Sequence, residues 1–328
     1  MSFATRDNQS KAPKVRKPYS QCPFYVKIFR DIVRSPALYI MLIPVLVYYF
    51  LFRYRPMYGV LIAFTDYMPG SGKIVDFSQW VGLEHFIDFF TGKDAWRVIR
   101  NTLQISLTTI LFGFPAPIIF ALLLNELRLP RYSKVVQTVS YLPHFISLVV
   151  ICGMIRTFVG GNGFISVILS NLGFIEPGVS LMGKMSAFLP VYVASDVWQT
   201  VGYNSIVFLA AIAGVNQELY EAATVDGASR WKRVWHVTLP SIMPTIITML
   251  LLRLGNVMTV GYEKIILLYS PQIYEVSDVI SSYVYRAGLQ QARYSYSTAV
   301  GLFNSVINFV ILLLANRISR KVSDTALW

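Results

Sequence analysis

Asp196 and Arg253 are charged side chains well inside long apolar stretches, where an unpaired charge is costly. Asp196 lies in the stretch 188–215, and Arg253 lies in the stretch 242–268. Such a group either pairs with an opposite charge or lines a polar pathway. Arginine is also the preferred bidentate partner of a carboxylate. The two residues therefore form a structural salt bridge, or Arg253 contacts an acidic ligand, and the sequence leaves both interpretations open.

No recognisable catalytic or metal-binding set accompanies these two residues. His85, His144 and His236 are far apart in the sequence and lack the spacing of metal ligands. Cys22 and Cys152 form neither a disulfide framework nor a metal motif. A membrane-embedded enzyme would need a nucleophile, a base or paired carboxylates close together. We therefore expect no catalytic residue and no cofactor or metal bound by this chain.

The composition indicates a protein of the lipid bilayer. Of the 328 residues, 55% are hydrophobic and only 14% are charged, whereas soluble domains carry about 25% charged residues. This excludes a disordered chain and argues against a soluble enzyme. The net charge of +12 could suggest nucleic acid, but most of it falls on segments that would be cytoplasmic if both termini lie inside. We therefore interpret it as a topology signal.

Six apolar runs approach or exceed the length of about 20 residues that a membrane-spanning helix needs. Backbone amides in hydrocarbon must be bonded internally, so the runs predict helices and an all-α membrane protein. The expected spans are 38–52, 102–124, 135–159, 188–215, 242–268 and 298–315. Pro115 and Pro117 are expected to kink the second span, because proline removes a helical hydrogen bond.

The spans suggest four regions of the chain. Residues 1–36 are expected to form a cytoplasmic tail and a helix at the membrane interface, although that helix could equally pack against the bundle. Residues 37–97 would form the first transmembrane helix and an extracytoplasmic loop. Residues 98–316 would form the main transmembrane domain, and residues 317–328 a cytoplasmic C-terminal tail.

The segment 216–240, between the fourth and fifth spans, predicts two short helices about a glycine. Its first half has good helix formers with acidic residues in the first turn. Gly227 then interrupts the helix, a basic amphipathic helix follows, and Pro240 begins the fifth span. A polar helical pair held between two spans would suit the docking of a cytoplasmic partner. An ordinary polar loop is the alternative.

The same segment contains a spaced motif. Glu221, Ala222 and Ala223 are followed by Asp226, Gly227 and Ala228, and then by Leu239 and Pro240, with the spacing EAA-x2-DGA-x10-LP. This pattern resembles the EAA loop of the membrane-spanning subunits of ABC importers. The resemblance extends over about 99–316, and the stretches 253–256, 274–279 and 283–286 are similar to maltose-type permeases for polysaccharide-derived oligosaccharides, including those with uronic acids.

The resemblance implies a type I ABC importer permease fold in a bacterial inner membrane, with cytoplasmic termini. It also implies a coupling helix that inserts into a cytoplasmic ATPase, where Glu221 would pair with a basic residue and Gly227 would permit the turn. The implied partners are a second permease, two ATPases that bind ATP and Mg, and an extracytoplasmic solute-binding protein. The chain itself shows no Walker motif: the fragment 70–73 lacks the required first glycine and the final Ser or Thr.

The resemblance further implies that sugar contacts lie on the fourth and fifth spans. A gapless alignment from Glu221 gives the substrate-path candidates Asp196, Gln199, Thr200, Tyr203 and Arg253. Asn256, in the family-like stretch 253–256, is a further candidate. An arginine in a cavity of low dielectric would favour an acidic sugar, so the expected function is import of an acidic oligosaccharide. Import of a neutral oligosaccharide is the alternative. An ion-coupled transporter would predict several buried carboxylates, yet only Asp196 clearly falls within a span.

Overall fold

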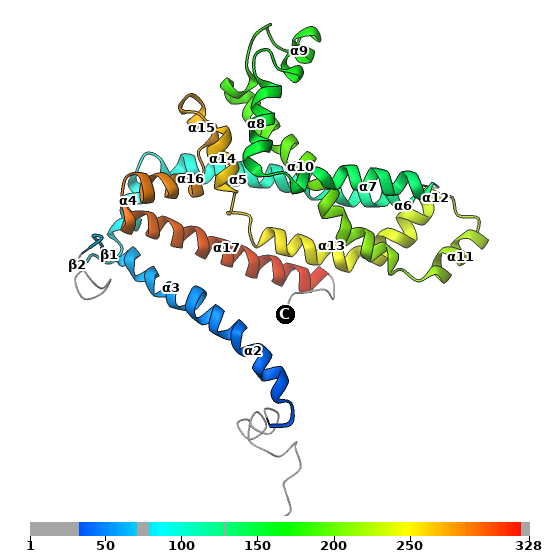
Figure 1. Cartoon of the computed structure of the whole chain (residues 1–328), viewed down its shortest axis with the longest axis horizontal. Coiled ribbons are helices and arrows are strands. Elements are labelled where there is room, and N and C mark those ends of the chain that lie inside the picture. The colour runs from blue at the N-terminus through cyan, green and yellow to red at the C-terminus, as the bar shows by residue number, and fades with distance from the viewer. Residues whose placement is uncertain (1–32, 71–78, 128, 323–328) are drawn as a thin grey trace, which may run out of the picture. The chain divides into compact units, whose positions relative to one another are not determined.

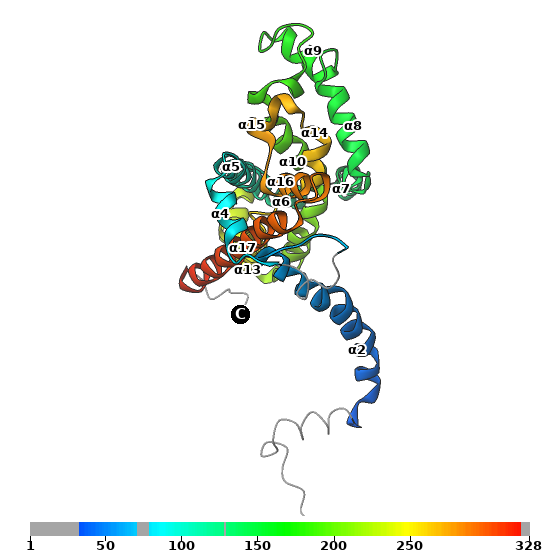
Figure 2. The same cartoon turned by 90° about the vertical axis from the view of Figure 1, so that its left-hand side faces the viewer.

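The computed structural model describes residues 33–70, 79–127 and 129–322, which are almost entirely helical (Figures 1 and 2). Five helical stretches among them are long and apolar enough to cross a bilayer, and a sixth is counted when α10 and α11, bent by 71°, are taken as one span. The expected all-α membrane fold is confirmed. The predicted N-terminal tail and interfacial helix lie outside the described residues, apart from their last few positions. The chain forms two compact units, Met1–Gly59 and Val60–Trp328.

The described part of the first unit is one apolar helical stretch. α2 (Pro36–Tyr49) begins with Pro36 in its first turn and continues through the π-helical turn η2 (Phe50–Tyr54) into α3 (Arg55–Met57). None of the side chains of these three elements is buried. An apolar surface of this kind requires lipid or another protein around it. The stretch therefore fits the expected first span.

The second unit begins with small elements that precede its long helices. η3 (Tyr58–Phe64) leads to β1 (Thr65–Asp66), which pairs antiparallel with β2 (Gln79–Trp80). This two-stranded ladder is the only β-structure in the described residues. α4 (Glu84–Thr91) follows and packs against the last helix of the chain through Phe89, Phe90 and Phe303.

The second predicted span is a pair of consecutive helices. α5 (Ala95–Gly113) and α6 (Pro115–Asn125) meet at Phe114, and together they make one apolar stretch of 31 residues. Pro115 starts α6, a position where its missing N–H is tolerated. Phe114 itself keeps α-helical dihedral angles, so the two helices continue as one span, and the kink expected from Pro115 and Pro117 stays a prediction.

The third span differs from the prediction of one helix over 135–159. The structure has α7 (Pro130–Phe145) and α8 (Leu148–Val159), separated by Ile146 and Ser147 in extended conformation. Pro143 weakens the end of α7, and the Ser147 hydroxyl caps α8 by accepting from the Val150 N–H at 3.4 Å. α8 turns away from α7 in Figure 1 and is followed by α9 (Phe164–Asn171).

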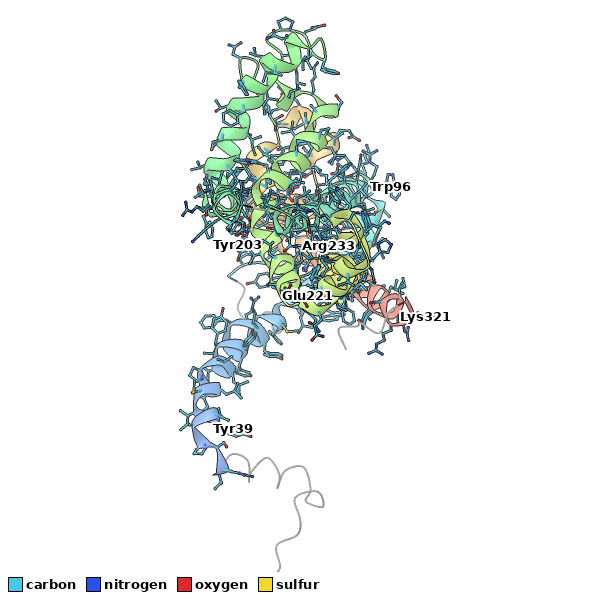
Figure 3. All side chains as sticks on the ribbon, turned by 90° about the vertical axis from the view of Figure 1, so that its right-hand side faces the viewer. Tyr39, Trp96, Tyr203, Glu221, Arg233 and Lys321 are labelled. Carbon is cyan, nitrogen blue, oxygen red and sulfur yellow. The ribbon has the colours of Figure 1, made fainter. Side chains whose placement is uncertain are left out.

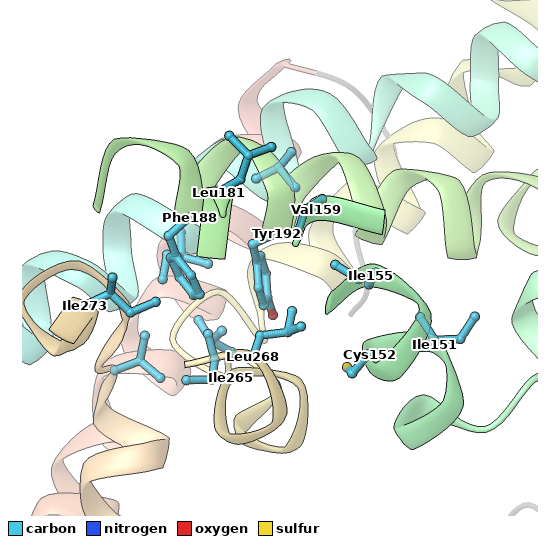
Figure 4. Close-up of a cluster of buried hydrophobic side chains, with 14 residues drawn as sticks. Ile151, Cys152, Ile155, Val159, Leu181, Phe188, Tyr192, Ile265, Leu268 and Ile273 are labelled. Atoms are coloured by element: carbon cyan, nitrogen blue, oxygen red, sulfur yellow. The ribbon is translucent and has the colours of Figure 1, made fainter. Parts of the chain in front are cut away.

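The centre of the second unit is α10 (Met185–Ala213), which follows η4 (Leu181–Gly183) and packs against α5, α6, α7 and α13. It approaches α7 so closely that a Cβ on Gly202 would collide with the Ser140 carbonyl. Small residues permit such contacts between membrane helices. One buried cluster joins α8, α10 and α14, and includes Phe188, Tyr192 and Leu268 (Figure 4).

The fifth span also differs from the prediction of one helix over 242–268. α13 (Leu239–Leu254) stops at Gly255, and α14 (Tyr262–Leu268) begins only after Gly261. The chain continues through the short elements η6 (Pro271–Ile273), α15 (Tyr274–Ser277), α16 (Ile280–Tyr285) and η7 (Arg286–Gln290). α17 (Tyr294–Val322) contains the sixth predicted span and lies beside α13 in both views (Figures 1 and 2).

A buried carboxylate fastens the segment after η6 to the start of α5. The Asp278 side chain is fully buried and accepts from both terminal nitrogens of Arg286, at 3.1 and 2.6 Å. Arg97 adds a contact at 3.5 Å, and the Asn101 amide donates to the Glu275 and Asp278 carbonyls. A buried charge needs several partners of this kind. The network fastens this segment to α5, a helix whose later residues line the cavity described next.

Candidate functional site

A cavity of about 280 Å³ lies between α5, α10 and the break that separates α13 from α14. Four of the six predicted substrate-path residues line it: Asp196 and Gln199 of α10, Arg253 of α13, and Asn256 in the break. Planar amide and guanidinium groups of this kind can hydrogen-bond sugar hydroxyls and carboxylates. The break in the fifth span is therefore part of the site.

The unwound backbone between α13 and α14 needs partners that a helix would otherwise supply, because such groups are tolerated at membrane depth only beside protein or water. Asn308 of α17 bonds one such backbone group and one side chain of the unwound segment. Its side-chain oxygen accepts from the Met258 N–H at 2.8 Å, and its amide nitrogen donates to the Thr259 hydroxyl at 3.0 Å. Thr259 itself lines the cavity. Asn308 thus holds the cavity wall in place.

Replacing Asn308 with alanine is expected to destabilise the protein by about 1–3 kcal/mol, because the buried Met258 N–H loses its acceptor. Thermal unfolding of the purified transport complex would measure the loss as a lowered Tm. Ser305→Ala on the same helix is the matched control, since the Ser305 hydroxyl donates only to the Gly301 carbonyl of its own helix. Equal Tm values for the two variants would contradict this role of Asn308.

Three charged side chains face the cavity among the described residues that line it. Oδ1 of Asp196 lies 3.5 Å from Nζ of Lys264, and Oδ2 lies 4.0 Å from a terminal nitrogen of Arg253. The exposed fractions of the side chains are 5% for Lys264, 20% for Asp196 and 49% for Arg253. The predicted contact between Asp196 and Arg253 is thus present at 4.0 Å, while Arg253 also faces the cavity; its contact with a substrate stays a prediction.

Lys264 is the charged residue that the sequence analysis missed. It belongs to α14, and its ammonium lies 3.5 Å from the Tyr192 carbonyl and 4.8 Å from the centre of the Tyr192 ring. The rule that singled out Arg253 would have found it, because Lys264 also falls within the apolar stretch 242–268. Thr109 of α5, which also lines the cavity, was missed as well; its buried hydroxyl has no hydrogen-bond partner among the described residues.

Thr200 and Tyr203, the other two candidates, are not part of the cavity lining. The Thr200 hydroxyl donates to the Asp196 carbonyl of its own helix at 2.8 Å. Tyr203 lies about two turns along α10 from Asp196, and its ring stacks on His144 of α7 with centroids 3.8 Å apart. Neither residue is within the site as the structure defines it.

The predicted helical pair between the fourth and fifth spans is present. α11 (Gln217–Val225) is followed by Gly227 at φ +74°, by α12 (Arg230–Arg233) and by the π-helical turn η5 (Val234–Thr238). The Asn216 side chain caps α11, and the Ser229 hydroxyl caps α12. The Tyr220 and Thr238 hydroxyls lie 2.9 Å apart and fasten α11 to η5.

The surface of this helical pair is both charged and apolar. Glu221 and Asp226 are exposed, and so are large apolar side chains beside them. Val225 is 88% exposed, and Trp231 and Trp235 are each 63% exposed. Exposed apolar residues among polar ones mark protein contact sites. Figure 3 shows Glu221 and Arg233 on the two arms of the pair.

Residues 113–324 match the family described as the inner membrane component of binding-protein-dependent transport systems. The chain belongs to this family of ABC importer permeases. The permease is 43% identical over 296 residues to protein LplB of Bacillus subtilis, covering 90% of this chain and 92% of LplB. It is 38% identical over 304 residues to the polygalacturonan/rhamnogalacturonan transport system permease protein YteP of the same organism. This match covers 92% of this chain and 93% of YteP.

A solved structure gives the same result for the fold of the permease. The crystal structure of a bacterial alginate ABC transporter, in complex with an alginate pentasaccharide-bound periplasmic protein, contains a chain that superposes with a TM-score of 0.83 at 43% identity. The match covers 92% of this permease and all of that chain. The expected family, fold and inner-membrane location are therefore confirmed.

Proposed function

We propose that this permease forms half of the pathway by which an ATP-driven importer carries an acidic oligosaccharide across the cytoplasmic membrane. The observation that carries the proposal is the half-exposed Arg253 guanidinium in a cavity that also contains the Gln199 and Asn256 amides. A guanidinium binds a carboxylate through two parallel hydrogen bonds, and the amides suit sugar hydroxyls. A uronic acid unit offers both kinds of group.

The relatives support an acidic cargo. Polygalacturonan and alginate, which appear in the names of two relatives at 38% and 43% identity, are both polymers of uronic acids. Their permeases share about two fifths of their residues with this chain over most of its length. A neutral oligosaccharide stays the alternative, because Asn256 and Gln199 would bind its hydroxyls equally well.

The helical pair α11–α12 is proposed as the contact to a cytoplasmic ATPase. Glu221, Ala222 and Ala223 lie on α11, while Asp226, Gly227 and Ala228 form the turn after it. The exposed Glu221 carboxylate would meet a basic residue of the ATPase, and the exposed Val225 would be covered on docking. ATP and Mg would be bound by two ATPase subunits, with no hydrolytic residue from this chain.

Two further partners complete the proposed complex. A second, homologous permease would supply the other half of the pathway, and an extracytoplasmic solute-binding protein would deliver the sugar. The periplasmic protein seen with the alginate transporter supports the latter. Closure of the ATPases would move α11–α12 and switch the access of the cavity from one side of the membrane to the other.

Uptake by intact cells tests this function. A strain that lacks the permease is expected to lose uptake of labelled trigalacturonate or of an alginate trisaccharide, and the wild-type chain should restore it. Maltotriose serves as the neutral probe in the same strains. Restored uptake of maltotriose, together with unchanged uptake of both acidic sugars, would favour the neutral alternative.

A further inference from the structure

We propose that Lys264 and Asp196 together set the charge of the cavity so that Arg253 stays available for one carboxylate of the cargo. The inference rests on the proposed function, because it concerns how the same cavity selects an acidic sugar. It assigns a positioning role to Lys264, a residue that would act on the cargo through Asp196.

The two contacts of Asp196 are unequal. Lys264 is almost completely buried and held on the Tyr192 ring and carbonyl, so its ammonium has little freedom to leave. Arg253 is half exposed, and its nearest nitrogen is 4.0 Å from the Asp196 carboxylate, too far for a hydrogen bond. Among the described residues, no hydrogen-bond acceptor is found for the Arg253 guanidinium. Its donors are therefore free to bind a ligand.

The charged side chains that line the cavity carry an excess of one positive charge. Asp196 is the acidic residue among the described lining residues, whereas Lys264 and Arg253 are both basic. One carboxylate cannot neutralise two cations, and an uncompensated charge is costly at low dielectric. Because the buried Lys264 holds Asp196, the excess positive charge resides on Arg253. One uronate carboxylate would neutralise this excess charge.

This arrangement predicts that a single substitution at Lys264 impairs binding of the cargo and that a second substitution at Asp196 restores it. Lys264→Met would leave Asp196 with Arg253 as its sole partner, so the pair would close and exclude the sugar carboxylate. Lys264→Met combined with Asp196→Asn would remove one charge of each sign and restore the original excess. Asp196→Asn alone would leave two free cations, which would bind the cargo more tightly and release it more slowly.

The test is the ATPase activity of the complete reconstituted complex with its binding protein, titrated with trigalacturonate. Lys264→Met is expected to raise KM or reduce stimulation by about tenfold or more, and the double variant to return within about threefold of wild type. Asp196→Asn alone should lower both KM and kcat. Glu263→Gln is the matched control, because the exposed Glu263 neighbours Lys264 but does not line the cavity.

The outcomes separate the competing roles. If Lys264→Met and the double variant are equally impaired while both complexes assemble, Lys264 contacts the sugar or is structural, and the inference is overturned. A Lys264→Met complex with wild-type KM and kcat also overturns it. If the Lys264→Met complex fails to assemble, Asp196→Asn is the deciding variant. Lowered KM and kcat support the inference, and unchanged values overturn it. A wild-type complex that responds to neutral sugars but to no oligouronate would instead contradict the proposed function.

Discussion

Replacing Arg253 with methionine is expected to reduce oligouronate-stimulated ATPase activity about 10- to 100-fold, the loss that follows when a charge-assisted hydrogen bond is removed. Methionine keeps much of the apolar stem but cannot bind a carboxylate. Asp196 would keep its contact with Lys264, so the cavity should retain its shape. Titration of the reconstituted complex with trigalacturonate measures both KM and kcat.

Two variants control this experiment. Arg253→Lys keeps the charge but loses the bidentate geometry, and an intermediate loss is expected. Arg156→Met removes an exposed arginine of α8 whose guanidinium donates to the Tyr269 carbonyl and which does not line the cavity. It should leave the response to trigalacturonate unchanged. Wild-type behaviour of Arg253→Met would remove Arg253 from the sugar pathway.

The second large effect is expected at the turn between α11 and α12. Gly227 has φ +74°, a conformation that costs a β-branched L-residue on the order of 1–2 kcal/mol. A Cβ there would meet no neighbouring atom within 4 Å, so conformation and not space limits the position. Gly227→Val should therefore redirect α11, uncouple the ATPases and abolish transport, although the membrane helices still fold.

Gly227→Asn separates conformation from side-chain size, since asparagine tolerates the left-handed region. It is expected to keep most of the transport that Gly227→Val loses. Copurification of the ATPase subunits and ATP-driven uptake into vesicles would report the two effects. If both variants transport equally well, the turn at Gly227 does not control the docking of α11.

The sequence identified the membrane helices where one apolar run makes one helix. The runs 188–215 and 298–315 correspond to α10 and α17 because their apolar residues continue for the full length of a span. The helical pair at Gly227 was also predictable, since helix formers, a glycine and a proline follow one another within 25 residues.

The breaks in the third and fifth spans were not predictable in the same way. Apolar residues such as Ile146, Val257 and Val260 continue across both breaks. Hydropathy alone therefore predicts one unbroken helix for each of the two spans. The fifth span is held open by Asn308, about fifty residues further along the chain. Such a partner becomes visible only once α17 is placed beside α13.

The candidate site could be predicted only in part, because it too depends on contacts between helices that are distant in the sequence. Asp196, Gln199, Arg253 and Asn256 were found because charge or a family pattern singled them out, and the fold brings them to one cavity. Tyr203 was not brought there, because it lies about two turns further along α10, where it stacks on His144 of α7. The cavity depends on helix packing that a single sequence does not show.

The most direct test of the proposed acidic-sugar pathway is a structure of the complete complex with trigalacturonate trapped in the membrane. We expect one uronate carboxylate to accept hydrogen bonds from the Arg253 guanidinium at about 2.7–2.9 Å, with Asp196 still beside Lys264. A sugar bound in another cavity, or one whose hydroxyls alone face Arg253, would contradict the proposal.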